Sequence, residues 1–188
     1  MSDLYPYQRD AVAAIQAAYR DGARSVLLQL PTGGGKTHLS ARGVIAPSVA
    51  KGRKVAFVAD LEEIVDDTAD RLRALGLTVG TVKAGRAADA TAPVQVCSLQ
   101  TLARRTDALP DAERVIIDEA HVSSARTARE ILQAYKDRGA LVLGLTATPA
   151  RGDGQPLDEF ERLVCGPSMR ELISAGALVP CTVFAPPR

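Results

Sequence analysis

Short apolar runs alternate along this chain with longer stretches in which apolar residues recur every three or four positions. A short apolar run bounded by turn residues is typical of a buried strand, and the wider spacing is typical of a helix with one buried face. The short runs predict strands at residues 25–30, 54–59, 79–83, 94–98, 114–117, 140–145 and 179–185. The longer stretches predict helices at residues 6–19, 37–46, 61–75, 125–136 and 167–175. Strands that alternate with helices indicate an α/β fold, in which a parallel sheet carries helices on both faces.

Three polar strings follow three of these strands, each at the point where its strand ends. Residues 31–37 read Pro-Thr-Gly-Gly-Gly-Lys-Thr, residues 118–121 read Asp-Glu-Ala-His, and residues 146–149 read Thr-Ala-Thr-Pro. Ligands of parallel α/β sheets bind beyond the carboxyl ends of the strands. We therefore expect the three strings to form one site.

The first string has the chemistry of a phosphate-binding loop. Its predicted nucleotide contacts are Thr32, Gly33, Gly34, Gly35, Lys36 and Thr37. The glycines let backbone N–H groups approach phosphate oxygens, and the helix that follows adds its positive end. Lys36 can reach the β- and γ-phosphates, and the Thr37 hydroxyl can bind Mg²⁺. The strict pattern G-x-x-x-x-G-K-[ST] needs a glycine where this chain has Leu30, so a glycine turn with a chance lysine is the alternative.

The second string offers two adjacent carboxylates, which point in different directions at the end of a strand. We assign Asp118 to Mg²⁺ and Glu119 to the attacking water, which it would orient and deprotonate. Taken alone, such a pair is usually a solvated surface pair. His121 is predicted to link the nucleotide site to the third string, although a lone histidine is more often packed or exposed.

Composition and charge remove several classes of protein. The 188 residues carry a formal net charge of +1, so nucleic-acid binding would need a local basic stripe. Cys97, Cys165 and Cys181 form no CxxC pair, which argues against a disulfide framework or zinc site and favours a reducing, cytoplasmic location. The first residues do not have the pattern of a signal peptide, and no apolar run reaches membrane-spanning length.

With these strings in this order, the chain resembles the first motor domain, a RecA-like P-loop NTPase domain, of superfamily 2 helicases of the DEAH-box type. The resemblance covers almost the whole chain and is strongest to bacterial repair helicases, restriction-enzyme translocases and XPB-like helicases. It implies an enzyme that hydrolyses ATP with Mg²⁺ and couples hydrolysis to movement on nucleic acid. It also implies that Thr146 and Thr148 relay nucleotide state to domain movement.

The same resemblance assigns Tyr5 and Gln8 to a motif whose glutamine reads adenine. A glutamine amide can pair with the N6/N7 edge of adenine, which gives a physical reason for preferring ATP. Gln8 could instead be an exposed residue of its helix.

In proteins of this helicase family, three segments contact the nucleic-acid backbone. The second and third correspond here to the candidate contacts Arg86, Gln100, Thr101 and Arg104. The arginines could equally belong to a solvated helix face. The first segment, residues 58–67, departs from the family because it carries Asp60, Glu62, Glu63, Asp66 and Asp67. Such an acidic face would repel phosphate.

The resemblance implies that residues 1–185 form the ATP-binding motor domain and that residues 186–188 begin a linker to a second motor domain. In this class the second domain supplies arginine fingers, which contribute a factor of roughly 10³ to 10⁵ in rate. We therefore expect the chain to be half of a motor that hydrolyses ATP slowly by itself. It would be an excised fragment, a truncated product or one subunit of a split helicase.

The expected partners are nucleic acid, with DNA favoured over RNA, and the second RecA-like domain, with no membrane. An ATP-gated nucleic-acid-binding or regulatory module without motor activity is the alternative, motivated by the acidic residues at 60–67. A P-loop kinase or GTPase is a third interpretation. The string at 146–149 and the lack of a guanine-reading N-K-x-D string argue against it.

Overall fold

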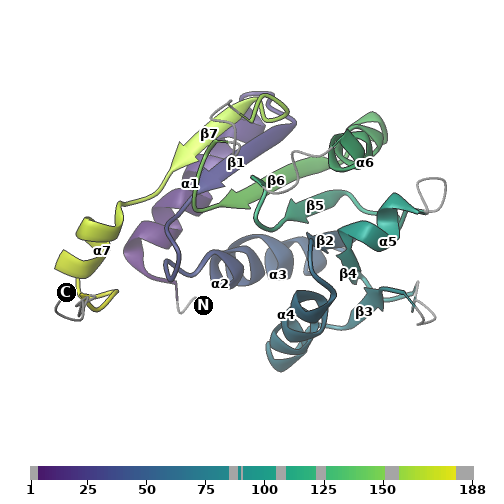
Figure 1. Cartoon of the computed structure of the whole chain (residues 1–188), viewed down its shortest axis with the longest axis horizontal. Helices are drawn as coiled ribbons and strands as arrows, with labels where there is room; N and C mark the ends of the chain where they lie inside the picture. Colours follow the sequence, from purple (N-terminus) through teal and green to yellow (C-terminus); the bar gives the residue numbers. More distant parts are fainter. Residues whose placement is uncertain are drawn as a thin grey trace, which may run out of the picture.

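The computed structural model describes residues 4–84, 89, 91–104, 109–121, 126–150 and 157–180. The helices are α1 (Pro6–Arg20), α2 (Lys36–Ser40), η1 (Ala41–Ile45), α3 (Ala46–Val49), α4 (Glu62–Ala74), α5 (Leu99–Ala103), α6 (Arg126–Asp137) and α7 (Met169–Ser174). The strands are β1 (Ser25–Gln29), β2 (Val55–Ala59), β3 (Val79–Val82), β4 (Val94–Ser98), β5 (Arg114–Ile117), β6 (Leu141–Thr146) and β7 (Arg162–Cys165). Figure 1 shows α7 at one end of the molecule, beyond the sheet.

Within the described residues the strands form one seven-stranded sheet in the order β3-β4-β2-β5-β6-β1-β7, and every neighbouring pair is parallel. The parallel arrangement brings the carboxyl ends of all strands to the same edge of the sheet. β1 lies between β6 and β7, which come from much later in the chain. The predicted fold, a RecA-like parallel sheet, is confirmed.

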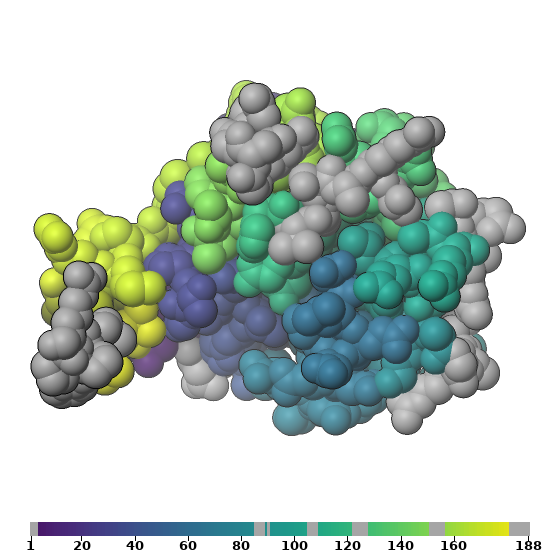
Figure 2. All heavy atoms as spheres, in the orientation of Figure 1, coloured from purple at the N-terminus to yellow at the C-terminus, as the bar shows by residue number. Residues whose placement is uncertain are grey.

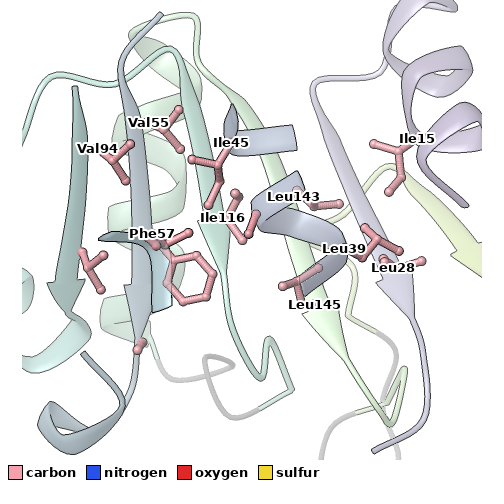
Figure 3. Packing of buried hydrophobic residues seen from close by; sticks show 14 of the residues in the cluster. Ile15, Leu28, Leu39, Ile45, Val55, Phe57, Val94, Ile116, Leu143 and Leu145 are labelled. Carbon is pink, nitrogen blue, oxygen red and sulfur yellow. The ribbon is translucent and has the colours of Figure 1, made fainter. Parts of the chain in front are cut away.

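Both faces of the sheet are buried beneath helices. On one face, Phe57 of β2 belongs to a core cluster with Ile15 of α1 and Leu39 of α2, as Figure 3 shows. On the other face, the next residue of β2, Val58, belongs to a cluster with Ile131 of α6. Successive side chains of a strand point to opposite faces of the sheet. A strand made of consecutive apolar residues therefore contributes side chains to the core clusters on both faces.

The helix after the phosphate loop runs past Pro47, so the predicted end at residue 46 was wrong. α2, η1 and α3 follow one another without a break, and in the π-helical turn η1 the Ala46 N–H donates to the carbonyl of Ala41. Proline offers no N–H to the carbonyl four residues earlier. The wider hydrogen bonding of the π turn lets the helix pass this position, and Pro47 then stands in the first turn of α3, where proline is tolerated.

Two elements have no counterpart among the predicted ones. α5 is short, and β7 is an edge strand whose residues are mostly exposed, so neither gives a strong apolar pattern. Residues 179 and 180 of the predicted strand at 179–185 are not in a strand, and its remaining residues lie outside the described part of the chain.

Candidate nucleotide site

Backbone hydrogen bonds tie the three polar strings together at the carboxyl edge of the sheet. The Leu30 N–H donates to the carbonyl of Thr146 at 2.9 Å, which joins the phosphate loop to the third string. The Ala120 N–H donates to the carbonyl of Leu145 at 2.8 Å, which joins the acidic string to the same place. The juxtaposition expected from the sequence is therefore present, with the end of β6 at its centre.

The phosphate loop takes a conformation that needs its glycines. Gly33 and Gly35 have φ values of +81° and +77°, in the left-handed region that other residues seldom adopt. A Cβ added to Gly34 would lie 2.8 Å from Cγ of Leu30. Leu30 is fully buried, and it occupies the position that the strict motif gives to glycine. The loop can accept this leucine because Gly34 has no side chain.

Lys36 lies inside the loop, with only 9% of its surface exposed. Its Nζ donates to the carbonyl of Leu30 at 3.3 Å and lies 3.6 Å from Oε1 of Glu119. An ammonium group has three N–H donors. Lys36 is thus held at the loop by one weak hydrogen bond and one ion pair, both of which a phosphate group could replace.

Glu119 adopts an unusual backbone conformation. Its φ is +45°, the only positive value at a non-glycine residue in the described part of the chain. Such conformations cost roughly 1–3 kcal/mol and cluster at functional sites. In this conformation the carboxylate faces two partners, because Oε2 lies 3.3 Å from Nδ1 of His121 while Oε1 faces Lys36.

His121 connects Glu119 to the third string. Its Nδ1 lies 3.0 Å from Oγ1 of Thr146. The Thr146 hydroxyl donates to the carbonyl of Thr148 at 2.7 Å and accepts from the Thr148 N–H at 3.0 Å. Its proton is thus directed at Thr148, so the contact with His121 requires an Nδ1–H donor. A continuous path runs from Lys36 through Glu119 and His121 to Thr146, which is fully buried.

Asp118 lies next to this path and is partly buried. Its N–H donates to the carbonyl of Val58, and its Oδ1 accepts from the Glu119 N–H at 3.1 Å. Burial, followed by the charge of Glu119, raises the pKa of the Asp118 carboxyl. A divalent cation at this position would oppose that shift by favouring the ionised carboxylate.

The residues present fit Mg·ATP. The glycine conformations and Lys36 suit phosphate oxygens, and the Thr37 hydroxyl and Asp118 carboxylate are hard oxygen ligands. Among the described residues no group of three or more His, Cys, Asp or Glu side chains could hold a metal by itself.

The N-terminal residues contact the loop directly. The Gln8 amide nitrogen donates to the carbonyls of Gly34 and Gly35 at 3.2 and 3.5 Å, and its Oε1 accepts from the Tyr5 N–H. Gln8 is 1% exposed, so it is not the exposed helix residue of the alternative. Tyr5 is 54% exposed and stacks on Tyr7, whose hydroxyl donates to the Gly34 carbonyl. The role of Gln8 in reading adenine stays a prediction, because both ends of its amide are used within the protein here.

The candidate nucleic-acid contacts have different surroundings. Gln100 on α5 and Arg104 directly after this helix are exposed, whereas Thr101 is only 6% exposed and its N–H donates to Oγ of Ser98. Arg86 lies outside the described residues. The structure therefore leaves Gln100 and Arg104 as the accessible members of this set.

Three of the carboxylates on α4 are paired with basic side chains. Asp66 lies 2.5 Å from Lys83, Asp67 lies 2.9 Å from Arg71 in the next turn, and Asp70 lies 2.8 Å from Arg73. Two of these carboxylates, Asp66 and Asp67, belong to the acidic segment at residues 58–67, and the cation beside each of them reduces the net negative charge of that segment.

Sequence reasoning missed two contacts of the loop. The Tyr7 hydroxyl on Gly34 and the Leu178 side chain against Gly33 come from opposite ends of the chain, and no motif marks either of them. A cavity of about 660 Å³, lined by α6 and by Asp158, Glu159 and Glu161, contains none of the predicted site residues. The site is thus defined by its side-chain chemistry and not by cavity size.

Comparison with known proteins identifies the family. Residues 1–151 match the family described as Type III restriction enzyme, res subunit. The chain belongs to this family. It is also 30% identical over 191 residues to the Type I restriction enzyme EcoAI endonuclease subunit of Escherichia coli. That alignment covers 94% of this chain but only 23% of the curated relative, so the chain spans about a quarter of that protein's length.

Solved structures share the fold of this chain. The helicase domain of Hef from Pyrococcus furiosus is 26% identical with a TM-score of 0.69, over 85% of this chain and 37% of that one. The Type ISP restriction-modification enzyme LlaGI, solved with a DNA substrate mimic, shares the fold with a TM-score of 0.66 at 16% identity, over 94% of this chain and 21% of that one. This res-subunit family member has the first RecA-like domain of a superfamily 2 helicase, a helicase-like ATPase domain. Among the helices that the structure describes, none has the length and apolar character needed to cross a bilayer.

Proposed function

We propose that this chain is the Mg·ATP-hydrolysing half of a DEAH-box translocase or helicase that moves on nucleic acid. The observation that carries the proposal is the path from Lys36 through Glu119 and His121 to Thr146 at one edge of the sheet. It joins a candidate phosphate-binding group to a candidate coupling residue through the proposed catalytic carboxylate. We further propose DNA as the polymer, because the matched family and the curated relative are restriction-enzyme subunits.

Each residue of the path has a distinct role in this proposal. Lys36 leaves Glu119 to bind phosphate oxygens, and Glu119 is then free to orient and deprotonate the attacking water. Bound Mg²⁺, held by Thr37 and Asp118, would neutralise charge on the phosphates. His121 transmits a movement of Glu119 to Thr146 through its contact with the Thr146 hydroxyl. That hydroxyl in turn bonds the Thr148 carbonyl in the third string.

The domain boundaries and the second half of the motor are part of the proposal. We infer that residues 1–185 form the ATP-binding domain and that residues 186–188 lead toward a second RecA-like domain, on the same chain or on a partner. Without the arginine finger of that domain, hydrolysis by the 188 residues is expected to be roughly 10³- to 10⁵-fold slower.

ATP hydrolysis tests the proposal most directly. Phosphate release is measured for the 188-residue chain and for the same chain supplied with a second RecA-like domain, with single- and double-stranded DNA and RNA. Lys36→Ala should remove most Mg·ATP binding. Glu119→Gln should keep binding and lower hydrolysis by about 10²- to 10⁴-fold. Glu113→Gln, the same change at the opposite end of β5, is the matched control and should leave both unchanged.

Two results would contradict the proposal. Hydrolysis that survives Glu119→Gln in the two-domain protein would remove Glu119 from the role of base. Strong stimulation of the isolated 188 residues by DNA would show that no second domain is needed.

An ATP-gated binding module without motor activity is the second candidate, and the acidic residues at the start of α4 and just before it favour it. Asp60, Glu62 and Glu63 are clustered where the family contacts the nucleic-acid backbone. Nucleic-acid affinity that changes with ATP, but with no movement along the polymer when the second domain is present, would select this candidate.

A further inference from the structure

The chain after β7 packs directly on the residue that precedes the phosphate loop. The Gly166 N–H donates to the carbonyl of Gln29 at 2.9 Å, which extends the pairing of β7 with β1 by one residue. A Cβ added to Gly166 would lie only 2.4 Å from Cδ1 of Leu30. The backbone at Gly166 therefore rests against Leu30, and any side chain there would push the two apart.

Helix α7 is fixed at both ends, although it is short. At its start, the Glu171 carboxylate accepts from the N–H and hydroxyl of Ser168, each at 2.7 Å, and the Glu171 N–H donates back to Ser168 Oγ. At its end, Gly176 has a φ of +69°, and the Ala177 N–H donates to the carbonyl of Leu172 at 2.9 Å. This is the hydrogen bonding of a Schellman motif, which reverses the chain direction after a helix. Leu172 itself is buried, so α7 is anchored to the domain.

The reversal places Leu178 on the phosphate loop. Cδ2 of Leu178 lies 3.0 Å from the position that a Cβ of Gly33 would occupy, and Leu178 is partly buried while Val179 is 87% exposed. Leu178 thus makes an apolar contact with the phosphate loop, whereas the next residue, Val179, projects into solvent. Figure 2 shows the yellow C-terminal residues against the dark blue surface formed by the segment after β1.

The loop is consequently held from two sides. Gln8 bonds the carbonyls of Gly34 and Gly35 from the N-terminal helix, and Leu178 packs against Gly33 from the C-terminal segment. A run of three glycines has many accessible conformations, so an unsupported loop would spend much of its time in geometries that cannot receive phosphate. A side chain packed against the loop reduces that number.

We propose that Leu178 is a positioning residue, which α7 presents to Gly33 to hold the phosphate loop in its nucleotide-receiving conformation. The inference rests on the proposed function, since it deepens the role of the same site. Leu178 does not contact the reacting atoms in this proposal. Removing the Leu178 side chain is expected to lower the fraction of molecules whose phosphate loop is in the nucleotide-receiving conformation. The apparent affinity for Mg·ATP falls in proportion to that fraction.

The test uses the 188-residue chain and two readouts. Titration calorimetry gives the Kd for Mg·ATP, and ¹⁵N spectra without nucleotide follow the amide signals and hydrogen exchange of Gly33 and Gly35. Leu178→Ala should raise the Kd about five- to tenfold, shift the Gly33 amide and speed its exchange. Leu178→Met, which keeps the volume, should restore wild-type values. Val179→Ala shortens the adjacent exposed side chain and should change neither readout.

A second variant covers the case in which Leu178→Ala does not fold. Gly176→Ala meets no neighbouring atom but strains the turn that presents Leu178, so it should move both readouts in the same direction by a smaller amount. A wild-type Kd and an unmoved Gly33 amide in either folded variant would overturn the proposal. A wild-type chain that binds no Mg·ATP would instead refute the proposed function. The amide readout, which needs no nucleotide, would still decide the role of Leu178.

Discussion

Replacing Thr146 by valine tests whether its hydroxyl organises the third string. The side chain is fully buried, and the change keeps its shape while removing one donor and two acceptor positions, which serve His121 and both backbone groups of Thr148. Each hydrogen bond contributes about 0.5–1.5 kcal/mol. Thr148 is exposed, so water can replace part of what its backbone loses. We therefore expect the free energy of unfolding to fall by about 1–2 kcal/mol and not by the full sum.

Urea unfolding followed by circular dichroism measures this loss, and thermal unfolding should show a decrease in Tm of roughly 2–8 °C for a domain of this size. Thr78→Val, the same change at an exposed position, is the control and should stay within about 0.5 kcal/mol of wild type. In the two-domain protein, Thr146→Val should keep Mg·ATP binding and lose most of the stimulation by nucleic acid. An unfolding free energy equal to that of wild type, with stimulation intact, would refute the network.

Two further predictions concern buried polar groups. Burial and the charge of Glu119 raise the pKa of Asp118, so the folded chain disfavours its carboxylate, and the cost is present above the ordinary pKa of 3.8 and absent below it. Asp118→Asn should therefore raise the free energy of unfolding of the nucleotide-free chain at pH 7. Urea titrations should show that the difference from wild type shrinks toward pH 4. A difference that grows on acidification would contradict the raised pKa of Asp118. The Tyr135 hydroxyl is buried without a hydrogen-bond partner among the described residues, so Tyr135→Phe should leave the unfolding free energy equal or higher by up to about 1 kcal/mol, and a clear loss would indicate a hidden partner.

The sequence predicted most of the fold because the strands are buried on both faces. Val94–Ser98 and Arg114–Ile117 were predicted at their observed bounds, because most of the residues in each short stretch are Val, Ile or Cys and residues typical of loops come before it. β7 was missed for the opposite reason: it is an edge strand, and most of its side chains face solvent, so no apolar run announces it.

The candidate site was predictable in its members but not in its contacts. The strand-end rule was enough to bring Lys36, Glu119, His121 and Thr146 together. No pattern in the sequence could reveal that Glu119 has a positive φ, that Gln8 bonds the loop, or that Leu178 covers Gly33, because each depends on tertiary packing between distant segments.

The position of β1 has a consequence for synthesis of the chain. Its sheet neighbours are β6 and β7, and 136 residues separate Gln29 from Cys165 (165 minus 29). At about 5–20 residues per second, a ribosome needs roughly 7 to 27 s to supply them. Both edges of β1 lack their native partners until β6 has been made, and one edge stays open until β7 follows. An apolar strand with open edges can pair with other chains. The strand that precedes the candidate nucleotide site thus completes its pairing late, and we expect the nascent chain to depend on chaperones until β7 emerges.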